Sequence, residues 1–233
     1  MQIDDEAIIL KKKKYGESSL LITFFSNHNG INTGLVKGVL KKDFGTYEIG
    51  NKVQIKANFR IENQLWNCKF ELIKNYSVFF FDENIKLNAL LSICTLVDLC
   101  LPYRLPQLNL YTKTIQLIED LKLNDWINKY ILWELFLLSE IGFGLDLKQC
   151  TISGSTENLI YISPNSGKAV SSSVGNKYHD KLFKLPVFFL NSSKKVDKKI
   201  IKDGFQITGF FLNKYLKINH NKNLPFYRKK ILI

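Results

Sequence analysis

Apolar and polar residues alternate along much of the first 75 residues, which is the pattern of half-buried β-strands. The clearest stretch carries Val53, Ile55 and Ala57 on one side, with polar residues between them. The predicted strands span residues 7–14, 19–25, 31–36, 51–59 and 65–73. Residues 41–50 are polar, hold two glycines and are expected to form a loop. Five short strands at this spacing predict a small barrel, most commonly the five-stranded OB-fold.

From about residue 87 the apolar residues recur every three to four positions, the period of a helix with one buried face. Pro102 stops the first such stretch, and Gly142 ends the third. The predicted helices span residues 87–101, 109–123, 125–141 and 192–216, the last weakened by two internal glycines. The predicted fold class is therefore α+β, with an OB-fold barrel domain over residues 1–80 and a helical domain over residues 81–233.

The chain is basic, with 33 Lys and Arg, 21 Asp and Glu, and a formal net charge of +12. The excess lies at the two ends. Residues 1–80 carry 12 basic and 8 acidic side chains, residues 81–190 carry 10 and 11, and residues 191–233 carry 11 and 2. Basic ends attract a polyanion such as nucleic acid. Only three of the basic residues are Arg, and a Lys bias of this kind is also typical of an AT-rich genome, so charge alone leaves nucleic-acid binding open.

Several classes of protein are disfavoured by the sequence. No apolar run reaches the roughly 18 residues of a membrane span, and the acidic N-terminus does not resemble a secretory signal, so a cytoplasmic protein is expected. The cysteines are scattered without a C-x2-C pair, which favours free thiols over disulfides or a metal site. No nucleophile, acid–base pair or phosphate loop has the required spacing. We expect a protein without a catalytic site, a metal or a cofactor.

The strongest charge run is residues 11–14, four consecutive lysines at the end of the first predicted strand. In a strand Lys11 and Lys13 share one face, and the two lysines between and after them share the other. Lysines neutralise phosphates without reading bases, but they also guard an edge strand against pairing, so both interpretations stay open. The nearby aromatic residues Tyr15 and Phe59 either stack on bases or are buried in the barrel.

An ordered pattern is formed near the N-terminus by residues 6–11, 15–17, 20–25 and 36–38, with Lys41 and Lys42 following. This pattern resembles that of the RecO family of bacterial recombination mediators. Residues 142–147, Gly-Phe-Gly-Leu-Asp-Leu before Cys150, resemble a further element of the family. Its later segments are similar to residues 161–164, 167–170, 185–186, 208–212 and 224–225. The similarities run in order over nearly the whole chain.

The resemblance implies an N-terminal OB-fold and a helical C-terminal region with a small zinc-finger-like insert. It implies a cytoplasmic, nucleoid-associated protein that binds single- and double-stranded DNA and anneals complementary strands. It also implies contact with the C-terminal tail of the single-stranded-DNA-binding protein SSB, and partnership with RecR in loading the recombinase RecA. The tail pocket is expected to be an apolar cleft rimmed by Lys or Arg. The residues assigned to DNA on this basis and from their charge are Lys11, Lys13, Lys37, Lys41, Lys42, Lys56 and Arg60.

One departure from the family pattern lies in the predicted insert, at about residues 148–176. Many members hold four cysteines there, whereas this chain has only Cys150, with Ser153 at the second position and no second pair in residues 171–174. One thiolate does not hold a structural zinc, which needs about four ligands. We therefore predict a finger-like insert without metal.

Two other functions remain open from the residues alone. A generic nucleic-acid module, including one that prefers RNA, has the same charge pattern, and annealing of DNA strands distinguishes it from a mediator. A protein-interaction adaptor explains the apolar helices, and an absence of DNA affinity distinguishes it from both.

Overall fold

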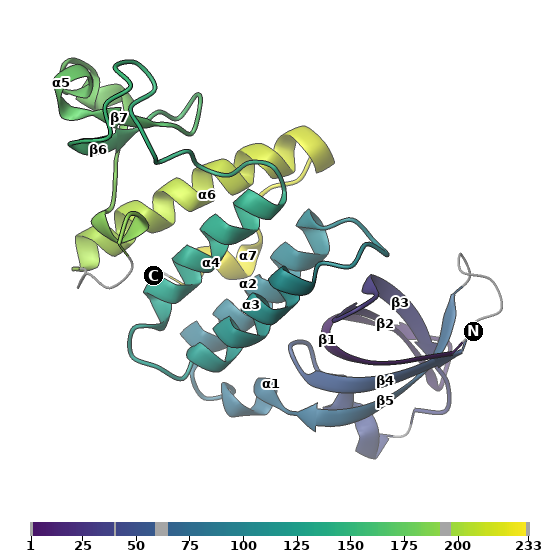
Figure 1. Ribbon diagram of the computed structural model, residues 1–233. Coiled ribbons are helices and arrows are strands. Elements are labelled where there is room, and N and C mark those ends of the chain that lie inside the picture. Colours follow the sequence, from purple (N-terminus) through teal and green to yellow (C-terminus); the bar gives the residue numbers. More distant parts are fainter. Residues whose placement is uncertain (1, 40, 59–64, 192–196, 232–233) are drawn as a thin grey trace. The chain divides into compact units, whose positions relative to one another are not determined.

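The computed structural model describes residues 2–39, 41–58, 65–191 and 197–231 (Figure 1). Contacts between residues divide it into two compact units. The first comprises Met1–Glu119 and Pro225–Ile231, and the second comprises Asp120–Leu224. These units are defined by contacts alone and do not test the domain boundary predicted at residue 80, which stays a prediction.

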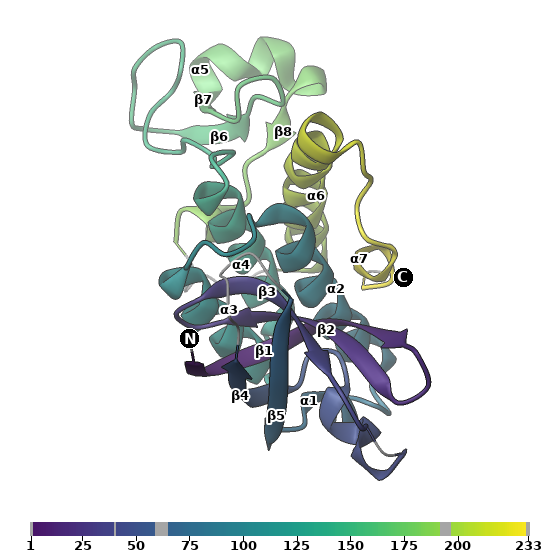
Figure 2. The ribbon, with the colours of Figure 1, turned by 90° about the vertical axis from the view of Figure 1, so that its right-hand side faces the viewer.

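The first unit contains a closed five-stranded barrel, visible in purple and blue in Figure 2. Its strands are β1 (Gln2–Tyr15), β2 (Ser19–Ser26), β3 (Gly30–Val36), β4 (Lys52–Asn58) and β5 (Trp66–Lys74). They follow the order β1-β2-β3-β5-β4. The ring closes because β1 also pairs with β4, while β3 and β5 pair in parallel. The predicted OB-fold barrel is confirmed.

The barrel core is built from the inward positions of the alternating pattern. Val53, Ile55 and Ala57 are buried in it, as the sequence predicted. The ring of Phe24 is fully buried in it, 6.0 Å from the ring of Trp66 and 5.6 Å from that of Phe70. Burying aromatic side chains of this size supplies a large part of the stability of a small barrel.

The predicted loop at residues 41–50 instead contains a 3-10 helix, η1 (Lys41–Tyr47). Its last residue, Tyr47, is buried and lies edge-on to Phe70, with 6.1 Å between ring centroids. An apolar contact from the end of the segment therefore holds it against the barrel, which the polar composition of residues 41–50 did not indicate.

Four helices complete the first unit: α1 (Tyr76–Phe79), α2 (Asn84–Cys100), α3 (Leu108–Asp120) and α7 (Phe226–Lys229). Helix α2 contacts β1 and α7. It buries most of the apolar residues that gave the predicted helical period, among them Leu90, Cys94 and Val97. The ring of Tyr111 on α3 packs edge-on against Phe25 of β2, with centroids 5.4 Å apart. The outward side of the barrel sheet is thus partly covered by helices.

The second unit contains two packed helices, α4 (Trp126–Glu140) and α6 (Lys198–His220), drawn in teal and yellow-green in Figure 1. The fully buried carboxylate of Glu134 accepts a 2.6 Å hydrogen bond from the hydroxyl of Thr208 between them. Helix α6 was predicted from residue 192. It begins after Asp197, whose side chain accepts the backbone N–H of Ile200, and residues 192–196 lie outside the described part.

A three-stranded sheet in the order β7-β6-β8 lies between these helices in sequence. Its strands are β6 (Leu159–Ile162), β7 (Ala169–Ser171) and β8 (Phe183–Lys184), and the first was predicted with the same bounds. The short helices α5 (Ser172–Gly175), η2 (Asn176–Lys181) and η3 (Val187–Phe189) connect the strands to α6. No helix in the described part of the chain is long and apolar enough to cross a bilayer.

Candidate nucleic-acid interface

The four lysines at positions 11–14 lie at the end of β1, and all four are exposed. They pair with β2 on one side through residues 20–23. Strand β4 pairs with β1 only from Gln2 to Ile8. The lysine run therefore lies on an edge of the β1–β2 hairpin, a position where lysines also prevent unwanted strand pairing.

A β-bulge decides which of these lysines face the inside of the barrel. Ile9 pairs with Phe24, and both belong to the barrel core. Plain alternation from Ile9 would turn Lys11 inward, but the register shifts between Ile9 and Lys11. After the bulge Lys12 pairs with the core residue Ile22.

The same register places Lys14 opposite the core residue Leu20, so Lys12 and Lys14 lie on the inward side. Lys11 and Lys13 lie on the outward side.

The inward pair lines a cavity of about 530 Å³ at this end of the barrel. Its lining residues are Lys12, Lys14, Glu17, Ser18, Ser19, Leu20, Val39 and Tyr47. Burial and the nearby Asp43 raise the pKa of Tyr47, so its phenol stays protonated at neutral pH. Lys12 lies 2.6 Å from the carboxylate of Glu48, an ion pair that is partly exposed and easily exchanged for another anion. The cavity thus combines two ammonium groups, the carboxylate of Glu17 and two serine hydroxyls with the apolar side chains of Leu20 and Val39.

The other residues predicted to contact DNA are spread around the barrel. Lys37 is exposed and follows Val36, which pairs with Leu20, so it lies at the same end as Lys14. Lys41 and Lys42 lie in η1, where only their backbone is described. Lys56 is exposed on β4 and pairs with the carboxylate of Glu71 at 3.2 Å.

Lys56 lies opposite Asp4 on β1, ten residues before Lys14, or about 33 Å of extended strand. The structure therefore does not bring Lys56 together with the lysine run. Arg60 and the predicted stacking residue Phe59 lie outside the described residues. Tyr15, the other aromatic candidate, is 55% exposed at the tip of the hairpin.

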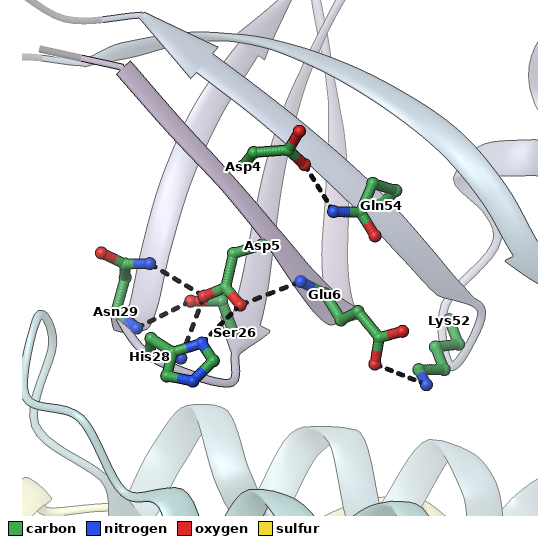
Figure 3. A network of polar contacts seen from close by, with 8 residues as sticks. All are labelled: Asp4, Asp5, Glu6, Ser26, His28, Asn29, Lys52 and Gln54. Carbon is green, nitrogen blue, oxygen red and sulfur yellow. Dashed lines mark hydrogen bonds and ion pairs between the residues drawn. The ribbon is translucent and has the colours of Figure 1, made fainter.

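The opposite end of β1 is anchored by a buried carboxylate (Figure 3). Asp5 is 5% exposed and accepts the backbone N–H groups of Glu6 and His28, the imidazole of His28 and the side-chain amide of Asn29. Burial raises the pKa of Asp5, but these hydrogen bonds and one from Ser26 outweigh it and lower the pKa below 3.8. The network ties the start of β1 to the β2–β3 turn and so fixes the strand that carries the lysines.

A second candidate surface lies within the second unit. A cavity of about 390 Å³ is lined by Leu135, Ser139, Leu145, Leu147, Lys148, Phe189 and Leu190. Its walls are mainly apolar, and among its described lining residues the one cationic side chain is that of the exposed Lys148. This combination suits a peptide that carries both an apolar side chain and a carboxylate.

The predicted insert holds a cluster of hydroxyls around one thiol. The sulfur of Cys150 accepts hydrogen bonds from the Ser153 backbone N–H at 3.5 Å and from the Ser171 hydroxyl at 3.4 Å. Desolvation raises the pKa of Cys150, but these hydrogen bonds outweigh it and lower the pKa to about 6. Among the described residues no three His, Cys, Asp or Glu side chains converge as a metal site would require. The finger-like character of the insert stays a prediction.

Comparison with known proteins identifies the family. Residues 1–76 match the family model "Recombination protein O N terminal", and residues 84–225 match "Recombination protein O C terminal". This chain belongs to the RecO family. The DNA repair protein RecO of Rickettsia bellii (strain OSU 85-389) is 34% identical over 95% of this chain and 92% of its own length. The DNA repair protein RecO of Wolbachia pipientis wMel is 33% identical over the whole chain and 99% of its own length.

Membership in this family supports a role in DNA repair and recombination, and it confirms the resemblance drawn from the ordered sequence segments. The sequence analysis did not predict that Lys12 and Lys14 face the inside of the barrel, or that Tyr47 lines the cavity beside them. The lysine run itself was a visible signal, but the bulge that selects its faces was not.

Proposed function

We propose that this chain binds single- and double-stranded DNA without base specificity and anneals complementary strands. We propose further that it acts with RecR to help load the recombinase RecA onto DNA coated with SSB. The proposal is supported by the family membership and by the barrel. It rests above all on the exposed lysine run beside a cavity at one end of that barrel. In this proposal the chain is a cytoplasmic, nucleoid-associated binding protein, not an enzyme.

The chemistry of the lysine run suits this function. An ammonium group acts as a point charge on phosphate oxygens, whereas reading a base requires directed hydrogen bonds to its edges. Phosphate contacts release counterions, so the affinity falls steeply as salt increases. A mediator has to act on any sequence, and contacts of this kind provide affinity without sequence preference.

The apolar cavity of the second unit is our proposed site for the C-terminal tail of SSB. That tail is acidic and ends in an aromatic residue, according to the family resemblance. Its ring would contact the apolar walls, and Lys148 would pair with its carboxylate. We expect Lys148→Glu to weaken binding of a labelled tail peptide. Lys168→Glu, at an exposed position that does not line the cavity, is the matched control.

Two double variants test the barrel site. One removes the inward lysines (Lys12→Gln with Lys14→Gln), and the other removes the outward lysines that the sequence analysis assigned to DNA (Lys11→Gln with Lys13→Gln). The two variants lose the same charge from the same strand. Each phosphate contact to a single strand contributes about 0.7 to the slope of log affinity against log salt. We expect the inward pair to lower that slope by about 1.4, and the outward pair to lower it less.

Affinity is measured by fluorescence anisotropy on a labelled 20-nucleotide strand, with urea midpoints to confirm that both variants fold. If neither pair changes the affinity at low salt, the lysine run is not the DNA site. If the wild-type chain binds RNA well but neither binds nor anneals DNA, the proposed mediator function is wrong.

A further inference from the structure

Helix α6 has one face that is basic and largely exposed. Its apolar face contacts α4: Phe205 lies 6.2 Å from Tyr130 between ring centroids, and Thr208 donates to Glu134. The opposite side presents exposed residues that recur at helical spacing. We define the α6 outer face by the residues Lys199, Lys202, Gln206, Phe210 and Lys217, all of which are exposed.

The lysines of this face are not neutralised by neighbouring carboxylates. In the described part of the chain no ion pair is formed by Lys199, Lys202 or Lys217, although the partly buried Asp203 lies on the same side. Several barrel lysines, by contrast, lie within about 3 Å of a carboxylate, as Lys52 does at 2.6 Å from Glu6. The α6 outer face therefore carries positive charge that is available to an external polyanion.

An aromatic ring lies in the middle of this charged row. Phe210 is 41% exposed, and the ring of Phe183 lies edge-on to it with 5.2 Å between centroids. The exposed Lys184 follows Phe183 in β8. Lysines flanking an exposed aromatic side chain are the arrangement on which unpaired bases stack while their phosphates are neutralised.

The dimensions of the face also suit a nucleic-acid strand. Eighteen residues separate Lys199 from Lys217, and at 1.5 Å per residue they lie about 27 Å apart along the helix. The two lysines lie on one line because 18 residues complete five turns. Phe210 lies close to that line, because the eleven residues from Lys199 make about three turns and the seven to Lys217 about two. A straight row of this length spans several nucleotides, with cations at both ends and a ring between them.

We propose that the α6 outer face is a second binding surface, for single-stranded nucleic acid, separate from the barrel. The inference rests on the proposed DNA binding for the class of ligand, and on the exposed lysines and Phe210 for the site. Annealing brings two strands together, and a chain with two such surfaces holds one strand on each.

The test is a titration of the full chain with fluorescein-labelled oligothymidylate of 20 nucleotides, measuring both stoichiometry and affinity. We expect the wild type to bind two strands, and Lys199→Gln with Lys217→Gln to bind one. Adding the same pair to the barrel variant Lys12→Gln with Lys14→Gln should weaken the remaining binding about 25-fold in 0.1 M salt, the loss of two phosphate contacts. Lys168→Gln with Lys177→Gln, two exposed lysines of the same unit outside α6, is the control for net charge.

A second variant tests stacking separately from charge. Phe210→Leu keeps an apolar side chain and should weaken single-strand binding in the barrel variant by about fivefold or more, while leaving duplex binding unchanged because paired bases do not stack on it. If the wild type binds DNA and the α6 substitutions alter neither stoichiometry nor affinity, this inference is wrong and the face serves another partner, such as an acidic protein. If the wild type binds no DNA, the proposed function fails as well.

Discussion

The buried carboxylate of Asp5 gives a sharp prediction about what holds β1 in place. Its Oδ1 accepts from the Glu6 N–H and the His28 ring, and its Oδ2 accepts from the His28 N–H and the Asn29 amide. In Asp5→Asn one of these oxygens becomes an amide nitrogen, which faces two donors and accepts from neither. Hydrogen bonds to a charged group contribute about 1.5 kcal/mol each or more, so the variant should lose about 3 kcal/mol.

Urea denaturation at pH 7 measures this loss. For a slope of about 2 kcal/mol per molar urea, the midpoint should fall by about 1.5 M. The control is Asp4→Asn, because Asp4 is exposed on the same strand and contacts only the side chain of Gln54 among the contacts described. An exposed substitution of this kind should change stability by less than about 0.5 kcal/mol.

The stability difference between the wild type and Asp5→Asn should also depend on pH. Because the pKa of Asp5 is lower in the folded chain than in the unfolded chain, its stabilising contribution is present above pH 3.8 and is lost as pH falls through the folded value. The difference between wild type and Asp5→Asn should therefore shrink below pH 3.8. Equal urea midpoints for Asp5→Asn and Asp4→Asn at pH 7 would refute the reasoning.

Two further predictions concern a turn and a thiol. Gly30→Ala should destabilise the chain by several kcal/mol more than Gly38→Ala in urea denaturation. Both glycines have φ +67°, but only at Gly30 would an added Cβ meet backbone, namely the carbonyl oxygen of Leu105 at 2.3 Å. Equal losses of stability in the two variants would contradict this. In an absorbance titration at 240 nm, the Cys150 thiol should ionise near pH 6, and Cys150→Ser should abolish this transition. Because folding lowers the pKa of Cys150, its contribution to the free energy of unfolding should grow from pH 6 to pH 9. If the first thiol transition lies above pH 8, the hydrogen bonds do not lower this pKa as described.

The barrel was predictable because apolar and polar residues alternate regularly along its strands. Val53, Ile55 and Ala57 all point into the core, and helix α2 buries Leu90 and Leu96, two of the leucines that gave it its period. The first five residues of β1, Gln2 to Glu6, were missed because four of them are polar. The burial of Asp5 is compensated by donors more than 20 residues away, which no local pattern records.

The site was less predictable than the fold. The lysine run was found, but the faces of its lysines depend on a one-residue bulge after Ile9, and a shift of one residue reverses every side chain. Gly204 was predicted to weaken α6. It is also a packing position, where a Cβ would lie 2.8 Å from the ring of Phe188, and the sequence did not show this. Close approaches of this kind are set by tertiary structure.

The central claim is that this chain promotes pairing of DNA strands through phosphate contacts. The most direct test is the rate of annealing of two complementary oligonucleotides coated with cognate SSB, with and without the chain, at 50 and 200 mM salt. We predict faster annealing that weakens at the higher salt, because each phosphate contact is salt-sensitive. No acceleration at either salt, with DNA binding intact, would contradict the account.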